Sequence, residues 1–416
     1  MGALDGIKVL DLSRILAGPW STMTLADLGA EVWKIEPPKG GDHTREWSPP
    51  EKSGVSTYFL SVNRNKKSVA VDLNKPAGRD LVRALAAKAD IVVENFRPST
   101  LRRWRLGYEH LRQTNPRLIY CSISGYGRDT PFADRPGYDF VLQAECGFMA
   151  ITGEPDGEPM RLGVAFVDLF TGMNAVQAIL AALFARERSG IGQSIDIALL
   201  DSGLQCLANV ATGFLNTDEE PVRHGNAHPS IVPYELFMCA DRQRLAVAVG
   251  TDEQYQRLCE RVLEAPDLWI DERYKTNRGR TMHRAELVPA LQKEISRHSS
   301  DVVVRLMREN GIPVGEVRSV GSALSSPEAT ARGAVVSAPS DALGEIRMVQ
   351  SPLRFSHTPI RAATAPPMLG EHTVSVLTDV LGMDSDSINL LIADETIASG
   401  SAEGRSALSP GARGTR

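Results

Sequence analysis

The first 200 residues alternate short β-branched runs with helical patterns, and this alternation most limits how the chain can fold. The strand-like runs lie at residues 7–12, 31–36, 69–73, 91–95, 118–122 and 194–197. Helical patterns separate them, at residues 19–28, 76–89 and 167–188. Pro19 suits the first turn of a helix, and Gly29 suits the position just after its end. The alternation predicts an α/β fold built on a parallel sheet.

The length of the chain predicts more than one domain. With 416 residues, of which 42% are hydrophobic, we expect two or three domains. We place the first part of a large domain at 1–200, a linker at 201–224 and a smaller α/β domain at 225–325. A second linker and a final helical region follow at 326–398. The small, polar residues 399–416 are expected to be disordered.

Charge and cysteine content exclude several classes of protein. A net charge of -5 provides no global field for nucleic acid or anionic membrane. The five cysteines are widely spaced and include no C-x-x-C, which predicts neither a disulfide framework nor a zinc site. The N-terminus lacks a signal-peptide pattern, and the most apolar helical stretch, at 175–185, is too short to cross a bilayer. We expect a cytoplasmic protein with no membrane or nucleic-acid partner.

Common motifs of nucleotide and hydrolase chemistry are missing from the sequence. No G-x-G-x-x-G follows a strand, and neither a phosphate-binding P-loop nor a G-x-S-x-G elbow occurs. His224 and His228 fall close together, but in a polar loop rather than on one helix face. We therefore expect no metal site and no permanently bound cofactor.

Several sequence segments, taken together in their order along the chain, resemble a known protein family, although no single motif is specific. They run V-L-D-L-S-R-I-L-A-G-P at 9–19, D-L-G-A-E-V at 27–32, N-R-N-K-K-S at 63–68, V-E-N-F-R-P at 93–98, G-Y-D at 137–139 and G-V-A at 163–165 before Asp168. P-P-M-L-G-E-H at 366–372 completes the set. In this order and spacing the chain resembles the class III CoA-transferases, of the formyl-CoA and carnitine CoA-transferase type. Residues 230–234 and 274–277 are most similar to transferases that pass CoA between dicarboxylates such as succinate and glutarate.

This resemblance implies a fold, an assembly and a set of substrates. The expected fold has a large Rossmann-like domain, to which the C-terminal region returns, and a small α/β domain. Two chains are expected to interlock as a homodimer. Coenzyme A is implied as a substrate, in the form of an acyl-CoA that exchanges its acid for another small carboxylic acid.

Asp168 is the expected catalytic residue. It follows an apolar run and opens a helical pattern, where the helix N-terminus would keep the carboxylate ionised and offer N–H groups to an oxyanion. A carboxylate can hold an acyl group as a mixed anhydride with an energy close to that of a thioester. Taken alone, an Asp at such a position is more often a helix cap. The surrounding family pattern favours the nucleophile.

The resemblance also implies which residues bind CoA. Ile15, Leu16 and Ala17 are expected against the nucleotide. Guanidinium groups suit the CoA phosphates, and the densest basic cluster spans 97–105. The complete predicted set for the CoA-bearing substrate is Ile15, Leu16, Ala17, Asn95, Phe96, Arg97, Arg103, Arg135, Tyr138 and Asp139. Some of these arginines are expected to lie on a solvated helix face instead.

The distal carboxylate of a dicarboxylate needs a cation, for which Arg45, Arg64 and Arg223 are candidates. Gly225, Asn226 and His228 form a loop that either recognises the acceptor acid or is an ordinary linker turn. Two alternatives to a transferase stay open: an α-methylacyl-CoA racemase and a non-catalytic CoA-binding protein. The racemase branch has a histidine where this chain has Tyr138, and a phenol is poorly matched to proton exchange near neutral pH.

Overall fold

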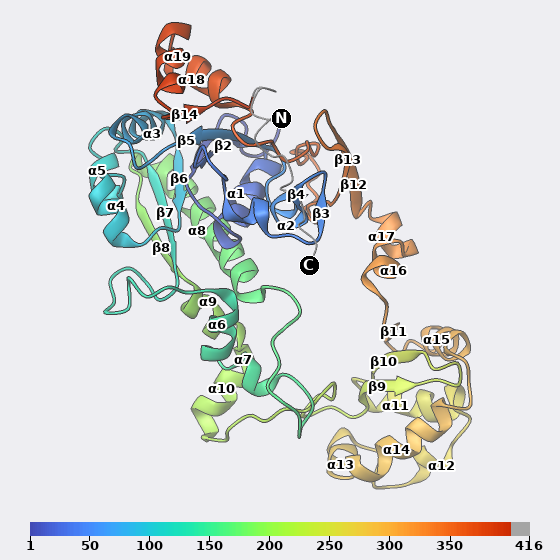
Figure 1. The fold of residues 1–416 in the computed structure, drawn as a ribbon. Coiled ribbons are helices and arrows are strands. Elements are labelled where there is room, and N and C mark those ends of the chain that lie inside the picture. The colour runs from blue at the N-terminus through green and yellow to red at the C-terminus, as the bar shows by residue number, and fades with distance from the viewer. Residues whose placement is uncertain (401–416) are drawn as a thin grey trace, which may run out of the picture. The chain divides into compact units, whose positions relative to one another are not determined.

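A computed structural model describes residues 1–400 of the chain, which divide into two compact units. Unit 1 contains Met1–Cys146, Gly163–Thr212 and the described residues from Thr330 onward. Unit 2 contains Gly147–Leu162 and Gly213–Ala329. Figure 1 shows the ribbon, with the blue N-terminal strands and the red C-terminal helices both in unit 1.

Unit 1 is built on a seven-stranded sheet in the order β14-β5-β2-β1-β6-β7-β8. Six strands pair in parallel, and only β14 runs antiparallel, against β5. The strands are β1 (Lys8–Asp11), β2 (Glu31–Glu36), β5 (Lys66–Val71), β6 (Ile91–Glu94), β7 (Ile119–Ser124), β8 (Ser194–Ala198) and β14 (Ile397–Ala398). The predicted α/β class and large parallel sheet are confirmed.

Apolar residues bury both faces of this sheet. One core joins sheet residues such as Trp33 and Val92 to helices on one face. Those helices are α3 (Pro76–Lys88), α4 (Pro98–Trp104), α5 (Tyr108–Leu111), α18 (Thr373–Leu381) and α19 (Ser385–Ala393). Two further helices, α1 (Ala17–Asp27) and α8 (Phe166–Ser189), pack against each other and against the strands.

Helix α1 begins earlier than the sequence predicted, at Ala17 rather than Pro19. Pro19 is its third residue, within the first turn, where a missing N–H costs no internal hydrogen bond. Gly29 follows the end of α1 with φ 116°, and Gly190 ends α8 with φ 75°. Both glycines adopt the left-handed conformation that the sequence predicted for helix ends.

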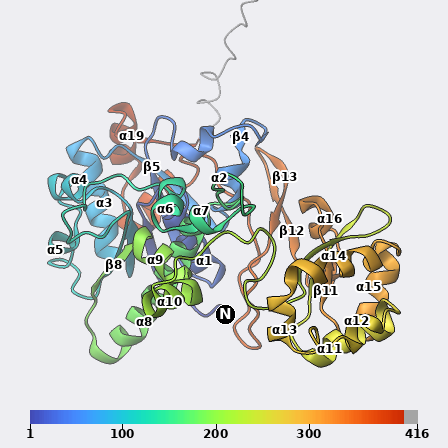
Figure 2. The same cartoon turned by 90° about the horizontal axis from the view of Figure 1, so that it is seen from below.

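Helix α8 corrects one expectation about length. It has 24 residues, and it is the one helix within residues 1–400 that is long and apolar enough to cross a membrane. The argument that the apolar stretch is too short was therefore wrong. A core helix passes the same test, and α8 packs against α1, α9 (Leu199–Cys206) and α6 (Asp139–Glu145), as Figure 2 shows.

The C-terminal segment returns to the sheet of unit 1. Ile397 pairs with Val71, and α18 packs against α3 and β5. A two-stranded ribbon of β12 (Val335–Ser340) and β13 (Gly344–Val349) precedes this return. Its core includes Phe59 of α2 (Thr57–Ser61), near the short strands β3 (Glu51–Lys52) and β4 (Val55–Ser56) and the 3-10 turn η1 (His43–Glu46).

Unit 2 is a smaller α/β body with its own core. Its three-stranded antiparallel sheet has the order β11 (Val314–Glu316), β10 (Arg244–Ala248) and β9 (Tyr234–Met238). Its other elements are α7 (Phe148–Ile151), α11 (Asp252–Arg257), the π-helical turn η2 (Leu258–Val262), α12 (Asp267–Ile270), α13 (Asn277–Met282), α14 (Arg284–Ile295), α15 (Ser300–Glu309) and α16 (Val320–Leu324). The short helix α17 (Pro327–Ala331) spans the boundary with unit 1.

The expected linker at 201–224 differs from the structure. Helices α9 and α10 (Ala208–Thr217) occupy most of it, with a break at Ala208, whose φ is 44°. The segment Gly147–Leu162 also belongs to unit 2, which no composition change in the sequence indicated. The expected disordered tail at 399–416 lies almost wholly outside the described residues.

Candidate functional site

A cleft of about 220 Å³ opens in unit 1 at the carboxyl ends of β1, β6 and β7. The chain proceeds from β1 outward through β2 to β5, and then resumes at β6 on the other side of β1. Loops at such a topological switch point diverge, and ligands of open α/β sheets bind there. The cleft residues are Arg14, Ile15, Leu16, Ala17, Asn95, Phe96, Arg97, Ile123, Ser124, Gly125, Ala133, Arg135, Pro136, Gly137, Tyr138, Asp168 and Leu199.

The turn between β1 and α1 forms one wall and holds an unusual backbone conformation. Ile15 has φ 73°, a left-handed value that is a strained outlier for a β-branched residue. Its N–H donates to the carboxylate of Asp42 at 3.3 and 3.4 Å. Asn95 bonds both the N–H and the carbonyl of Arg14, at 2.9 and 2.7 Å. These contacts hold the turn in its strained conformation, which persists only where surrounding contacts fix it.

A buried polar network supports this turn from below. Lys34 Nζ lies 2.9 Å from Asp42 and donates to the carbonyl of Ser13 at 3.0 Å. Asp11 accepts hydrogen bonds from Ser13 and Thr22 and lies 3.1 Å from Lys66 Nζ. Burial lowers the pKa of Lys66 to about 8, although the charge of Asp11 raises it. The turn therefore rests on satisfied buried charges, which resist displacement.

Asp168 lies in the first turn of α8, where Asp139 caps the helix from α6. Asp139 Oδ1 accepts from the backbone N–H groups of Val167 at 2.8 Å and Asp168 at 3.2 Å. Gln143 Nε2 donates to the other carboxylate oxygen at 2.6 Å. Asp168 itself is thus not the cap. The expectation that the first N–H groups of α8 are open to an oxyanion was wrong at Val167 and Asp168, because Asp139 occupies them.

Burial, together with the smaller effect of the negative charge of Asp139, raises the pKa of Asp168 from 3.8 to about 7. Within residues 1–400 its carboxylate has no hydrogen-bond or ion-pair partner to oppose this. We predicted that the helix N-terminus would keep Asp168 fully ionised. Instead desolvation prevails, because the N–H groups that would stabilise the charge are bonded to Asp139.

Tyr58 of α2 is also close to this carboxylate. Burial, followed by the negative charge of Asp168, raises the pKa of Tyr58 to about 12. The phenol therefore stays protonated at neutral pH and can act only as a hydrogen-bond donor or acceptor.

The structure brings together most of the predicted CoA-binding residues. Ile15, Leu16, Ala17, Asn95, Phe96, Arg97, Arg135 and Tyr138 all line the cleft with Asp168, and Asp139 lies directly behind it. Arg97 is exposed at the start of α4, whereas Arg135 pairs with Glu145 and stacks over Tyr126 at 4.5 Å. Arg103 is exposed on α4 and is not a lining residue.

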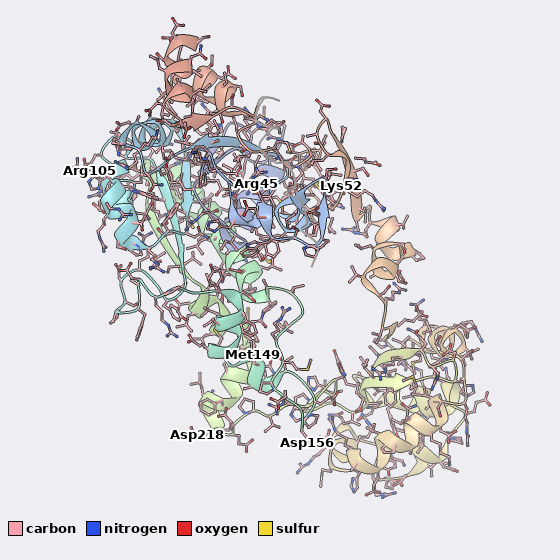
Figure 3. The ribbon with its side chains drawn as sticks, in the orientation of Figure 1. Arg45, Lys52, Arg105, Met149, Asp156 and Asp218 are labelled. Carbon is pink, nitrogen blue, oxygen red and sulfur yellow. The ribbon has the colours of Figure 1, made fainter. Side chains whose placement is uncertain are left out.

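Two of the predicted acceptor-binding arginines are instead structural. Arg45 lies 2.7 Å from Glu36 and stacks 3.7 Å over the ring of Phe59, inside unit 1 (Figure 3). Arg64 makes a two-pronged pair with Asp27 at 3.0 and 2.5 Å and lines a different cavity. Both predictions are corrected, since each guanidinium is buried against a carboxylate of the chain and neither lines the cleft.

The remaining acceptor-binding candidates belong to unit 2. Arg223 donates to the backbone carbonyls of Ala150, Glu154, Pro155 and Gly157. Gly225 has φ 59° and donates to the carbonyl of Gly153 at 3.1 Å. The ring of His228 packs 5.2 Å from Tyr234, and its Nδ1 accepts from the N–H of Ser230. These contacts order the loop around Asn226, while a role in acceptor binding stays a prediction.

Sequence reasoning missed several contributors to the cleft. Arg14 belongs to the first motif but was not selected, although an arginine in a turn after a parallel strand is a usable signal. Gly125 and Gly137 let two segments cross closely, because a Cβ on Gly137 would lie 2.7 Å from the Cα of Gly125. Asp42 and Tyr58 gave no signal, since only the folded chain places them beside residues 15 and 168.

The described part of the chain contains no cluster of potential metal ligands. No group of three or more His, Cys, Asp or Glu side chains within residues 1–400 could hold a metal ion. The five cysteines are free thiols, and burial raises the pKa of Cys121 and Cys146.

Comparisons with known proteins agree with this geometry. A model of CoA-transferase family III matches residues 4–373. The chain is 43% identical over 383 residues to a succinate–glutarate CoA-transferase of Agrobacterium fabrum, covering 91% of this chain and 95% of that one. It is 42% identical to the succinyl-CoA:glutarate CoA-transferase of Mus musculus, covering 95% and 91%. A crystal structure of a CAIB/BAIF family protein from Brucella suis superposes with a TM-score of 0.82 at 41% identity, covering 91% and 99%.

Proposed function

Because this chain belongs to CoA-transferase family III, we propose that it moves CoA from succinyl-CoA to a dicarboxylate such as glutarate. As a member of that family it is a CoA-transferase. The observation that carries the proposed mechanism is Asp168, a desolvated carboxylate without a cationic partner that faces the cleft at the sheet's switch point.

The proposed reaction proceeds through two anhydrides and one thioester on Asp168. The carboxylate attacks the thioester carbonyl of the donor, which forms an acyl–aspartyl anhydride and releases CoA as a thiolate. The thiolate attacks the aspartyl carbonyl, so the donor acid leaves and an aspartyl–CoA thioester remains. The acceptor carboxylate then displaces the thiolate as a second anhydride, and the thiolate takes the acceptor acyl group. No water or net proton is consumed.

The environment of Asp168 suits this nucleophile. A carboxylate removed from water and unpaired with a cation is less stabilised as an anion, which favours its conversion into a neutral anhydride. Holding the CoA thiolate in the cleft keeps it an intramolecular nucleophile, an effect of about 7–11 kcal/mol in favourable cases. The proposed CoA-binding residues are those of the cleft walls at 14–17, 95–97 and 133–138.

The composition of the cleft supports transfer over racemisation. Racemisation needs a side chain that removes the α-proton near neutral pH, for which histidine is the common choice. None of the cleft-lining residues in the described chain is a histidine. Tyr138 occupies the position in question and is 54% exposed.

Mass spectrometry of thioester products tests the function. We expect wild-type protein with succinyl-CoA to give new acyl-CoA species with glutarate and other dicarboxylates, and Asp168→Ala to fold normally and give none. Peptide mapping of the reacting enzyme should find covalent CoA on the peptide that contains Asp168. An active Asp168→Ala variant, or an adduct on another residue, would contradict the mechanism.

The expected homodimer and the cytoplasmic location stay predictions. A stable monomer in sedimentation experiments would show that the predicted assembly is wrong.

A further inference from the structure

Arg14 is a cation of the cleft whose guanidinium donors have no acceptor within residues 1–400. It is half-buried beside Ile15 in the strained turn and lines the same cleft as Asp168. One face of its guanidinium lies 4.5 Å from the centroid of Phe96. Within residues 1–400 the guanidinium has no ion-pair or hydrogen-bond partner, so its in-plane donors remain available to a ligand.

Asp42 interacts with the charge of Arg14 but forms no ion pair with it. Asp42 is paired at 2.9 Å with Lys34 and also accepts from the N–H and hydroxyl of Thr44, at 3.0 and 2.9 Å. Its acceptor sites are thus used by groups that hold the turn. Within the described chain the Arg14 guanidinium contacts the ring of Phe96, and this cation–π contact leaves its N–H donors available to a ligand in the cleft.

The other arginines are less suited to an anionic substrate group near Asp168. Arg135 pairs with Glu145, and Arg97 is exposed on the outer wall at the start of α4. Arg45 and Arg64, which the sequence suggested, are buried against Glu36 and Asp27. Of the cations in the described part of the cleft, Arg14 combines partial burial with a free fork of donors.

Arg14 lines the same cleft as Tyr138 and Asp168. Asp139, the residue after Tyr138, accepts a hydrogen bond from the backbone N–H of Asp168 at 3.2 Å. A five-carbon diacid spans about 5 Å between its terminal carbons, since each C–C bond is about 1.5 Å long. A diacid joined to Asp168 therefore extends its second carboxylate by several ångströms within the cleft that Arg14 also lines.

We propose that Arg14 binds the distal carboxylate of the diacid through a two-pronged ion pair, and so determines specificity for dicarboxylates over monocarboxylates. This role rests on the proposed function. A guanidinium matches the planar geometry of a carboxylate, whereas an ammonium offers only a point charge. A monocarboxylate of the same length would leave the Arg14 donors unsatisfied in a partly desolvated cleft.

The test compares Arg14→Gln and Arg14→Lys with wild type on a matched pair of acceptors, glutarate and pentanoate, with the donor kept constant. In a double-displacement reaction kcat/KM for the acceptor is independent of the donor. We expect Arg14→Gln to lower kcat/KM for glutarate by about 10- to 100-fold, and that for pentanoate by less than about 3-fold. Arg14→Lys should fall between. The donors succinyl-CoA and butanoyl-CoA should show the same contrast.

Arg97→Gln is the matched control, because it removes a cation from another wall of the same cleft. We expect it to affect both acceptors equally and to raise KM for both acyl-CoA donors. An equal loss with glutarate and pentanoate in Arg14→Gln would overturn the assignment and place Arg14 on CoA instead. Wild-type protein that transfers CoA to neither acid would refute the proposed function itself, a result distinct from failure of the Arg14 assignment.

Discussion

Replacing Asp168 by asparagine should stabilise the folded protein while it abolishes transfer. Asparagine keeps the shape of the side chain and removes the charge that burial disfavours. The pKa of Asp168 rises from 3.8 to about 7 on folding, so the ionised carboxylate is less favourable in the folded than in the unfolded chain. Asp168→Asn has no such cost at any pH.

The magnitude follows from the size of the pKa shift. At about 1.4 kcal/mol per pKa unit, the full shift corresponds to about 4 kcal/mol. Asp168 lines an open cleft and is only partly buried by its exposed area, so solvent screens part of this and we expect about 1–2 kcal/mol. The cost is absent below pH 3.8, grows between pH 3.8 and about 7, and is complete above about 7.

Urea denaturation at two pH values measures this effect. The difference in unfolding free energy between Asp168→Asn and wild type should be near zero at about pH 4 and reach about 1–2 kcal/mol near pH 8.5. In parallel, kcat/KM of wild type should rise with pH through an apparent pKa of about 7. A variant that is no more stable than wild type, or a gain that does not depend on pH, would refute the reasoning.

Substitutions at three further positions test the contacts that support the cleft. Asp139→Asn should retain the cap of α8 and shift the acid limb of the kcat/KM profile to lower pH, because it removes the charge beside Asp168. Asp139→Ala should cause the same shift and also lower the unfolding free energy by about 1 kcal/mol, because it removes the cap. An acid limb that moves in neither variant would contradict the coupling between Asp139 and Asp168. Glu94→Gln removes the buried carboxylate that pairs with Arg128 and so links the walls at 95–97 and 125–138, and it should raise KM for acyl-CoA by about 5- to 30-fold with kcat nearly unchanged. A fall in kcat alone would argue against that wall-to-wall link. Ile15→Gly should raise the unfolding free energy measured in urea by about 1 kcal/mol, because glycine adopts the left-handed conformation without strain. The same variant should bind acyl-CoA more weakly. A lower unfolding free energy would show that packing of the Ile15 side chain outweighs the strain.

Much of the fold follows from local patterns that the sequence displays directly. The strands of unit 1 are β-branched runs between helices. Gly29 and Gly190 follow the ends of helices, at positions where a left-handed backbone conformation favours glycine. The family resemblance is confirmed by the family model and by relatives at more than 40% identity. The discontinuous make-up of unit 2 could not be predicted, because Gly147–Leu162 joins it through contacts with residues far along the chain.

The candidate site shows a similar limit. The resemblance selected Asp168, Tyr138 and Asn95, and the structure gathers them around one cleft. The ion-pair partners of Arg45 and Arg64 could not be predicted from the sequence, because Glu36 and Asp27 contact them only in the folded chain. Likewise, whether a helix N-terminus stabilises a nearby carboxylate depends on whether another side chain already occupies its N–H groups.

The antiparallel strand β14 has a consequence for how the protein is made. Ile397 pairs with Val71, and Thr373 accepts from the N–H of Ala70, so the outer edge of β5 is covered by segments that are synthesised about 300 residues after it. At 5–20 residues per second, about 20–60 s pass between the emergence of these two partners from the ribosome. During that interval β5 is a bare strand edge, the kind of surface on which nascent chains of neighbouring ribosomes can pair. A chain that stops before β14 would leave this edge of β5 exposed, and we expect such a chain to associate through it.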